Sequence, residues 1–240
     1  MKKISGKIGS ILLAVSAFAA FTPGMNAEEK KVESNSKKEE VKSETFTARK
    51  VFENLSSTYL EAIPKSTRLD MLDYWDADSI YKAVNVLEGL SWIESLSDNY
   101  MRLRISPVST LQIKILPVKK GEIALTIYTV GDEAQSEDSF LKFFDQDLKE
   151  LPTEKYFKSP EIKDFFEIPK GSYTKMKEIE QMIPFPTIAY DASPENNDLK
   201  ARLTVERYMN QDDWNIAKLF ALPYVILEWK GDKYKPEKKK

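Results

Sequence analysis

"NYMRLRISPVSTLQIKILPVKKGEIALTIYTV", residues 99–130, alternates apolar with polar or small residues in three runs. The runs cover 99–105, 109–116 and 122–130, and the connections between them are short. A period of two is typical of β-strands with one face on a core and one face toward water, and short connections make neighbouring strands antiparallel. This stretch therefore predicts an antiparallel meander, with "SWIESL" (91–96) as one more strand in front of it.

Basic and aromatic side chains occupy polar positions of this meander. With a simple strand register they share one face of the sheet, which carries Tyr100, Arg102, Arg104, Lys114 and Tyr128, together with Gln112. Arginine and aromatic groups side by side are suited to an anionic glycan or a peptide, whereas a solvated sheet face has the same composition. Both interpretations stay open here, and the first five residues are the candidate ligand-binding residues.

Helices are predicted on the N-terminal side of the meander. Apolar residues at spacings of three and four predict a helix over 48–63 that stops at Pro64. A short helix is expected from about Thr67, and a third over 79–88, where Gly89 ends it. These helices would pack on the apolar face of the sheet.

The second half of the chain mixes both kinds of element. Residues 139–151 fit either a strand with a turn at 145–147 or a short helix. A strand over 223–229 is nearly continuously apolar, which favours a central position in a sheet. The other expected elements are a helical turn at 160–166, helices over 172–183 and 211–220, and strands over 187–192 and 199–208. The predicted fold class is α+β, with N-terminal helices packed on a mainly antiparallel sheet (meander about 91–130) and further helices and strands in the second half of a single domain over 47–234.

The first 27 residues have the pattern of a bacterial secretory signal peptide. Three lysines within the first seven residues precede an apolar run over 11–21, which is too short to anchor the chain across a bilayer. The sequence favours cleavage after Ala27, with the small residues 17–19 as the alternative, and no cysteine follows that could carry a lipid. We expect an exported protein of the periplasm or cell envelope that does not span the membrane after signal removal.

Charged segments flank the predicted domain. Residues 28–46 mix both signs of charge and have almost no apolar content, so they predict a disordered tether. Residues 235–240, "KPEKKK", predict a disordered basic tail, with contact to a membrane surface as the functional alternative.

The absence of two residue types excludes several chemistries. The chain of 240 residues has no histidine and no cysteine. Ser-His-Asp and Cys-His catalysis and His- or Cys-ligated zinc are therefore impossible, and the fold cannot depend on disulfides. A formal net charge of −2 gives no general attraction to nucleic acid. The sequence predicts no cofactor and no nucleic-acid partner.

Four aspartates gather in "STRLDMLDYWDAD" (66–78), which suggests either a cation site or helix caps. A calcium loop that starts at Asp76 would need a glycine at its sixth position and a glutamate at its twelfth, and it has neither. Thr67 and Asp70 fit a capping box, and Asp76 or Asp78 would cap the helix expected to follow. Capping is the preferred interpretation, and no metal site is predicted.

Two patterns point weakly to hydrolysis. "SYTK" (172–175) resembles the Ser-x-x-Lys motif of penicillin-binding proteins, but the companion motifs are missing and chance supplies matches this short. A glycosidase needs two carboxylates, one of them with a raised pKa, and only Glu228 lies where the sequence suggests burial. No catalytic residue is nominated.

Four stretches together resemble one known family. They are "ARKVFENLSSTYLEAI" (48–63), "RLDMLDYWDAD" (68–78), "LSDNYMRLRISPVSTLQIKIL" (96–116) and "LPYVILEW" (222–229). The chain is similar over most of its length to DUF3256, a family of uncharacterised secreted proteins of Bacteroidales. The resemblance implies this origin and export, and it implies no reaction. In the family, an acidic-Ser pair leads into an aromatic strand, which favours the strand interpretation of "EDSFLKFFDQDL" (137–148).

The functional expectation combines export with binding. We expect a periplasmic or cell-envelope protein that is not an enzyme and acts as a binding or envelope-associated module. An envelope glycan or another envelope protein would be its partner. The alternative is a carboxylate-dependent hydrolase acting on polysaccharide. An open patch of the outward arginines and tyrosines of 100–128 would favour binding, and a deep cleft with paired carboxylates would favour the hydrolase.

Overall fold

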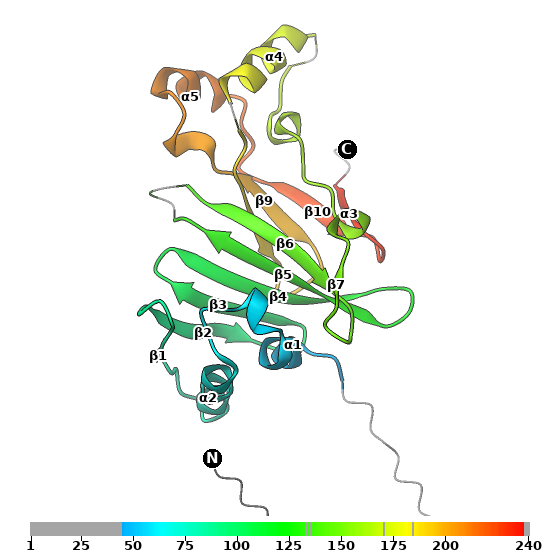
Figure 1. The fold of residues 1–240 in the computed structure, drawn as a ribbon. Coiled ribbons are helices and arrows are strands. Elements are labelled where there is room, and N and C mark those ends of the chain that lie inside the picture. Colours follow the sequence, from blue (N-terminus) through cyan, green and yellow to red (C-terminus); the bar gives the residue numbers. More distant parts are fainter. Residues whose placement is uncertain (1–44, 133, 135, 170, 184, 238–240) are drawn as a thin grey trace, which may run out of the picture. The chain divides into compact units, whose positions relative to one another are not determined.

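Two antiparallel sheets form the centre of the fold (Figure 1). The computed structural model describes residues 45–237 except 133, 135, 170 and 184; the expected signal peptide (1–27), most of the expected tether and residues 238–240 lie outside the described residues. The larger sheet follows chain order: β1 (Ala83–Val84), β2 (Leu90–Leu96), β3 (Tyr100–Ser106), β4 (Ser109–Pro117), β5 (Glu122–Val130), β6 (Asp138–Phe144) and β7 (Glu150–Leu151). The smaller sheet has the order β11–β10–β9–β8, with β8 (Ile188–Ala192), β9 (Leu199–Leu203), β10 (Val225–Trp229) and β11 (Tyr234–Pro236).

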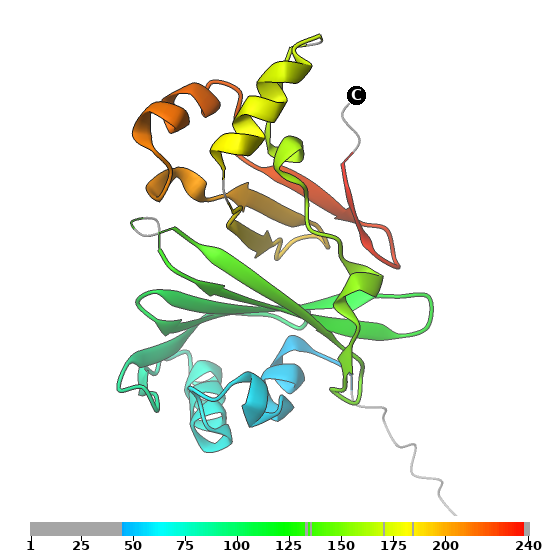
Figure 2. The same cartoon turned by 45° about the horizontal axis from the view of Figure 1, so that its top comes forward.

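Short helices connect and cover these sheets. They are α1 (Ala48–Asn54), η1 (Ser57–Tyr59), α2 (Lys65–Asp76), α3 (Thr153–Tyr156), η2 (Ile162–Phe165), α4 (Tyr173–Met182), η3 (Val205–Arg207) and α5 (Gln211–Ala217). Figure 2 shows α1 and α2 on one side of the seven-stranded sheet and the four-stranded sheet on its other side. The α+β class is confirmed, and the second sheet is a feature that the sequence did not predict.

The predicted meander is confirmed in β2 to β5, but the expectation that one of its faces meets water is wrong. The register places Gln112 opposite Ile127 and Lys114 opposite Leu125. Residues directly opposite each other share a face, so the apolar residues of β5 lie on the face that carries the polar residues of β4. The sheet therefore has apolar side chains on both faces and needs a cover on both.

Each face has its own core. On one face, Phe52 of α1 and Leu72 of α2 are buried together with Leu103 and Ile113 of the sheet. The other face is covered by the smaller sheet: the residues buried there include Leu125, Ile127 and Phe143 from the larger sheet and Ile188, Tyr190, Leu199 and Leu227 from the smaller one. Burial of two such layers supplies the hydrophobic stabilisation that a chain without disulfides requires.

The first helix is shorter than predicted, because the helix expected over 48–63 ends at Asn54. A buried side chain from α2 accounts for this end. Arg68 Nη1 donates to the carbonyl oxygens of Phe52 at 2.6 Å and Leu55 at 2.8 Å. These carbonyls at the end of α1 are without intrahelical partners, and a cation is favourable at this end of a helix. A tertiary contact, which local sequence does not reveal, thus ends α1.

The second helix starts earlier than predicted. α2 begins at Lys65, directly after Pro64, and no side chain caps it. Thr67 and Asp70 therefore lie inside the helix, and the capping box predicted from them is wrong. The physical reason is that proline sets a backbone angle suited to a helix start, so the chain turns helical two residues before Thr67.

The helix predicted over 79–88 is wrong, since β1 and a hairpin loop occupy this segment. Asn85 is the reason. Its buried amide Nδ2 donates to Ile105 O at 2.8 Å, and its Oδ1 accepts from the N–H groups of Leu87 at 2.9 Å and Gly89 at 3.1 Å. An asparagine side chain that bonds to nearby backbone competes with a helix, and here it fixes a loop instead.

The strand interpretation of 139–151 is confirmed by β6 and β7, with the turn at 145–147. The expected strand over 199–208 ends at Leu203, where η3 takes over. β10 is an inner strand, as predicted for 223–229, but it belongs to the smaller sheet. β11 includes Lys235 and Pro236, two residues of the segment predicted to be a disordered tail; they are ordered because β11 pairs with β10.

Candidate ligand-binding pocket

The five residues predicted to form a binding face do not form an open patch. Tyr100 and Lys114 are only 6% and 1% exposed, because they lie between the two sheets. Tyr128 lies on the opposite face, where it packs against the core that contains α1 and α2. The pairing of Tyr128 with Leu111 shows why: the register of β5 is shifted by one residue from the simple register that we assumed.

The other two candidate residues, Arg102 and Arg104, are partly exposed but paired. The Nε atoms of both arginines donate to the carboxylate of Glu94 at 2.9 Å each. Arg102 Nη1 also donates to Asp191 of β8 at 3.2 Å, which joins the two sheets. These ion pairs occupy the charges that a ligand would need, so the arginines have a structural role in this arrangement.

Burial between the sheets shifts the pKa of several groups. It lowers the pKa of Lys114 and raises the pKa of Tyr100. Lys114 Nζ has no hydrogen-bond partner among the described residues, and the ring centroid of Tyr100 lies 6.0 Å away. Burial also raises the pKa of Tyr190 to about 12. These shifts arise within packed structure rather than at an open site.

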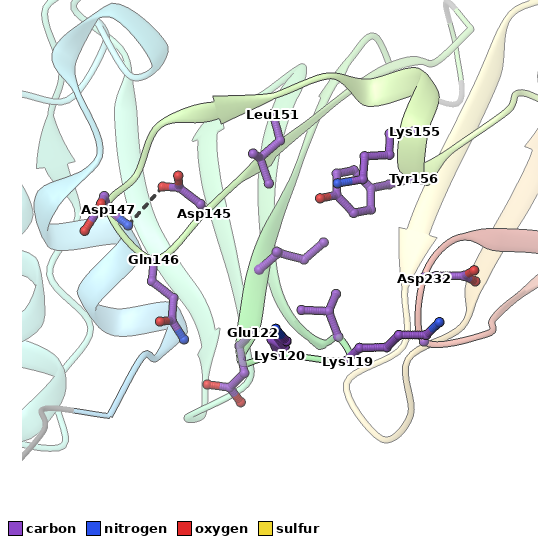
Figure 3. Close-up of a pocket in the computed structure, with 13 residues that line it drawn as sticks. Lys119, Lys120, Glu122, Asp145, Gln146, Asp147, Leu151, Lys155, Tyr156 and Asp232 are labelled. Atoms are coloured by element: carbon purple, nitrogen blue, oxygen red, sulfur yellow. Dashed lines mark hydrogen bonds between the residues drawn. The ribbon is translucent and has the colours of Figure 1, made fainter.

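A cavity of about 650 Å³ opens where four connections meet at one end of the sheets (Figure 3). The β4–β5 turn, the β6–β7 turn, α3 and the β10–β11 turn each contribute side chains to it. The lining residues are Val118, Lys119, Lys120, Glu122, Ile123, Asp145, Gln146, Asp147, Leu151, Lys155, Tyr156, Gly231 and Asp232. This volume lies in the range of small-molecule sites.

Apolar side chains form the floor of this pocket and lysines stand on its rim. Ile123 and Tyr156 are buried, and both belong to the core between the sheets. Lys119, Lys120 and Lys155 are exposed, and none of them forms an ion pair within the described part of the chain. Lys155 Nζ lies 4.9 Å from the ring centroid of Tyr156, a cation–π contact that keeps this amine near the pocket.

Two of the four acidic residues of the pocket are engaged in its own turn. Asp145 Oδ1 accepts from the backbone N–H groups of Asp147 and Lys149 at 2.9 Å each. Asp147 pairs with Lys149 at 3.4 Å. Glu122 and Asp232 have no ion-pair partner among the residues described. The pocket thus offers three unpaired ammonium groups against two unpaired carboxylates above an apolar floor.

The sequence interpretation missed this pocket. Its clearest local signal is "PVKKG" (117–121), where two lysines are adjacent in a tight turn that Gly121 closes with a φ of +82°. The other walls come from segments far along the chain, so only the tertiary structure assembles them. A turn with two lysines is by itself an ordinary surface feature.

The aspartates of 66–78 do not gather around a cation. Within the described residues, no three His, Cys, Asp or Glu side chains are placed to hold a metal ion. Asp76 instead forms a bidentate pair with Arg49, with distances of 2.7 and 2.6 Å, and this pairing lowers the pKa of Asp76. The predicted caps at Asp76 and Asp78 are wrong, because a turn and β1 follow α2 in place of a helix.

Residues of the two patterns that pointed to hydrolysis form ion pairs away from the pocket. Lys175 of the "SYTK" stretch pairs with Glu178 at 2.6 Å within α4. Glu228 is paired with Lys230, and its side chain is 33% exposed rather than buried. Neither lines the pocket.

Comparison with known proteins places this chain in a family. The family model described as protein of unknown function (DUF3256) matches residues 40–234. The chain belongs to the DUF3256 family. The resemblance seen in the four sequence stretches is thus confirmed, and the match includes every strand except the last two residues of β11. A search of curated proteins finds no match.

The fold of this DUF3256 protein is similar to a solved structure. That structure is of a domain of an uncharacterized protein from Porphyromonas gingivalis W83, with a TM-score of 0.67 and 20% sequence identity. The similarity covers 80% of this chain and 98% of the solved chain. At this identity the likeness supports the fold alone. In the part of the chain that the structure describes, no helix has the length and apolar character needed to cross a membrane.

Proposed function

We propose that this DUF3256 protein is an exported, non-catalytic binding module of the cell envelope and that the pocket of Figure 3 is its ligand site. The observation that carries the proposal is the cavity of about 650 Å³ with an apolar floor and three unpaired lysines on its rim. A concave site with a largely apolar lining and a few polar groups is the usual form of a small-molecule site.

The ligand class follows from the side chains of the pocket. Lys119, Lys120 and Lys155 would bind an anionic group, and the apolar floor at Ile123 would contact an apolar face of the same molecule. Glu122 and Asp232 would accept hydrogen bonds from hydroxyl groups. An acidic saccharide has a carboxylate, hydroxyl groups and an apolar ring face, so an acidic envelope glycan meets all three requirements.

The carboxyl groups of the protein favour binding over hydrolysis. A glycosidase needs a general acid whose pKa is raised. Among the described residues, the carboxyl groups whose pKa is displaced are Asp76, Glu150 and Glu161, and in each the hydrogen bond of a cation lowers the pKa. None of these three groups lines the pocket. Within the described residues, these displaced carboxyl groups therefore offer no candidate for the general-acid role, which supports binding over hydrolysis.

The proposed location is supported by the N-terminal sequence. Residues 1–27 combine early lysines, an apolar run and a small residue at position 27, which is the pattern of a cleaved export signal. The test is fractionation of cells that express the full chain, followed by N-terminal sequencing of the mature protein. We expect the protein in the periplasmic or envelope fraction with Glu28 as its first residue, and an uncleaved cytoplasmic protein would contradict the proposal.

The binding function is tested with the mature chain on an array of neutral and acidic glycans, and hits are measured by calorimetry. We expect binding to acidic saccharides without release of products. A Lys119→Ala/Lys120→Ala variant should lose at least about tenfold in affinity, because each charge-assisted hydrogen bond contributes roughly 1.5 kcal/mol or more. The matched control is Lys177→Ala/Lys218→Ala, which removes two exposed lysines outside the pocket. Equal loss in both variants, or product release from a bound glycan, would overturn the proposal.

A further inference from the structure

Every sheet edge presents backbone N–H and C=O groups that can pair with another strand, and folded proteins usually protect such edges. Three edges in this fold are protected. Next to β1, the N–H of Val86 donates to Ala62 O at 3.0 Å. The edge strand β11 ends in Lys235 and Pro236, residue types that disfavour further pairing. At the edge of β8, backbone N–H groups donate to side chains of the larger sheet, among them Asp138 and Ser139.

The fourth edge, along β6, is not protected in this way. β5 pairs with all seven residues of β6 on one side, whereas β7 pairs only with Phe143 and Phe144 on the other. In the described part of the chain, residues 138–142 therefore have no strand beyond them. Thr153 Oγ1 reaches this edge with one long bond, 3.4 Å to Leu141 O.

Alternation along the strand identifies the outward-facing backbone groups. Phe143 pairs with β7, and the carbonyl of Leu141 points toward Thr153 on the same side. Since successive residues of a strand point to opposite neighbours, Ser139 also faces outward. The N–H and C=O groups of Ser139 and Leu141 are thus the ones available to an added strand, with the Ser139 N–H currently bonded to Asp138 Oδ1 at 3.1 Å.

An apolar groove of about 390 Å³ runs along this same edge. It is lined by Asp138, Ser139, Phe140, Leu141, Lys142, Thr153, Phe157, Ser159, Pro186, Ile188 and Tyr190. Phe140, at the centre of the unpaired segment, is 57% exposed. A large exposed aromatic side chain beside unpaired backbone is a feature of a strand-pairing surface rather than of a solvated edge.

We propose that this edge pairs with the β6 strand of a second copy of the chain, antiparallel and with a two-fold axis at Phe140. In this register Ser139 lies opposite Leu141 of the second copy, and the reverse holds across the axis. Both pairs use outward-facing groups, so each pair exchanges two backbone hydrogen bonds. The two Phe140 side chains face each other in the closer, non-hydrogen-bonded pair.

Two properties of the segment favour a second copy over an unrelated peptide. Phe140 is the middle residue of the unpaired segment 138–142. In this register each residue of the segment therefore lies opposite a residue of the same segment in the second copy, up to Phe143, where pairing with β7 begins. The same register puts Asp138 opposite Lys142 of the second copy; within its own copy Lys142 also pairs with Glu150 at 2.8 Å, and Asp138 Oδ1 also accepts from the Ile188 N–H at 3.2 Å. Opposite charges at directly facing positions are favourable and like charges are unfavourable, and this interface is isologous, as in most dimers.

The experiment uses the fact that the chain has no cysteine. Phe140→Cys introduces a single thiol at the proposed axis, where the facing Cα atoms of a non-hydrogen-bonded pair lie about 4.5 Å apart, within disulfide range. We expect rapid formation of a disulfide-linked dimer of the mature chain under mild oxidation. Leu219→Cys is the control, because Leu219 is 75% exposed and lies in no proposed interface.

The oligomeric state of the unmodified chain completes the test. Light scattering on the mature wild-type chain should give a concentration-dependent dimer, and Phe140→Asp should give a monomer with an unchanged melting temperature. Phe140→Ser serves as a second variant if the aspartate unfolds the protein, and it should weaken the dimer at least tenfold. A wild-type chain that stays monomeric, cross-linking of Phe140→Cys no faster than Leu219→Cys, or an unrelated peptide seated on β6 of a monomer would each overturn the proposal.

Discussion

Gln112 lies opposite the backbone of Ala192 and acts toward β8 as a neighbouring strand would. Its Oε1 accepts the Ala192 N–H at 2.9 Å, and its Nε2 donates to Tyr190 O at 3.2 Å. Gln112 is 1% exposed, so these bonds are shielded from water. One carboxamide thus supplies both a donor and an acceptor to the unpaired edge of the smaller sheet, which explains why a polar residue is buried between two sheets.

Replacement of Gln112 should destabilise the protein strongly. Gln112→Leu removes both partners and leaves the Ala192 N–H and the Tyr190 carbonyl buried without hydrogen bonds. Each unsatisfied group costs roughly 1–3 kcal/mol, so for the two groups we expect a loss of about 2–6 kcal/mol in the free energy of unfolding, measured by urea denaturation. Gln146→Leu, at an exposed glutamine of the β6–β7 turn, is the control and should change little. Equal stability of the two variants would show that Gln112 does not join the sheets.

Replacement of Lys114 should have the opposite effect. Its amine is buried without a hydrogen-bond partner among the described residues. Lys114→Met keeps a side chain of similar length and removes the charge. We expect a gain of about 1–3 kcal/mol in the free energy of unfolding, because a buried polar group without a partner destabilises the folded state. A loss of stability in the methionine variant would mean that the ammonium group has a partner in solution.

The same lysine predicts a pH dependence. Burial lowers the pKa of Lys114 in the folded state, so between that pKa and the unfolded value of about 10.4 the unfolded chain binds more protons. The contribution of Lys114 to the free energy of unfolding therefore rises with pH in this window. We expect the advantage of Lys114→Met over the wild type to shrink as urea titrations move from pH 7 toward pH 10. A stability advantage of Lys114→Met that stays constant with pH would show that Lys114 does not cause this pH dependence.

Tyr190, a second buried group, has a pH dependence of its own that does not disturb this comparison. Burial raises the pKa of Tyr190 to about 12, while in the unfolded chain a tyrosine ionises near pH 10. Above about pH 10 the folded state binds more protons at this group, so the contribution of Tyr190 falls as pH rises. Because Tyr190 is present in both proteins, its contribution cancels in the difference between the variant and the wild type.

Arg68 should contribute strongly to the docking of the two N-terminal helices. It is 2% exposed, and its hydrogen bonds to Phe52 O and Leu55 O satisfy the end of α1. Arg68→Met removes both donors, and we expect a loss of about 2–4 kcal/mol in urea denaturation, because two buried carbonyls lose their partners. Arg49→Met removes the exposed pair with Asp76 and serves as the control, with a much smaller expected effect.

The aspartates of α2 should be neutral for stability and for calcium. Asp70 is exposed inside the helix and caps nothing. Asp70→Asn should therefore change the free energy of unfolding by less than about 0.5 kcal/mol. Calcium at millimolar concentration should leave the melting temperature of the mature chain unchanged relative to a chelator control. A calcium-dependent rise would restore the cation site that the sequence first suggested.

The local sequence predicted best those elements whose apolar residues follow a single period, either that of a strand or that of a helix. The alternation over 99–130 and the apolar spacing in 172–183 were enough to predict β3 to β5 and α4. The failures lie where a contact to a distant part of the chain competes with local preference. Arg68 of α2 ends α1, and Asn85, whose amide also bonds to Ile105 O of β3, fixes a loop where a helix over 79–88 was predicted. Neither of these two long-range bonds is visible in a window of neighbouring residues.

The candidate site could not be predicted for a related reason. The arginines of β3 have the composition of a binding face, but their partners Glu94 and Asp191 come from two other strands, one of them in a sheet that the sequence did not predict. The pocket of Figure 3 is built from three turns and the short helix α3, which come from three separate stretches of the chain, 118–123, 145–156 and 231–232. Turn residues carry little periodic signal, so their meeting point depends wholly on how the sheets pack.

The amino-acid sequence by itself determined the family, the meander and the exclusion of histidine and cysteine chemistry, because these depend on local order and composition alone. Only the tertiary structure decided which face of each strand is buried. A shift of one residue in strand register moves every side chain of a strand to the other face. The pairing of Lys114 with Leu125 shows that β5 is shifted in this way from the simple register. That register turned a predicted binding surface into the buried contact between two sheets and left the pocket, and the edge of β6, as the surfaces that remain available to partners.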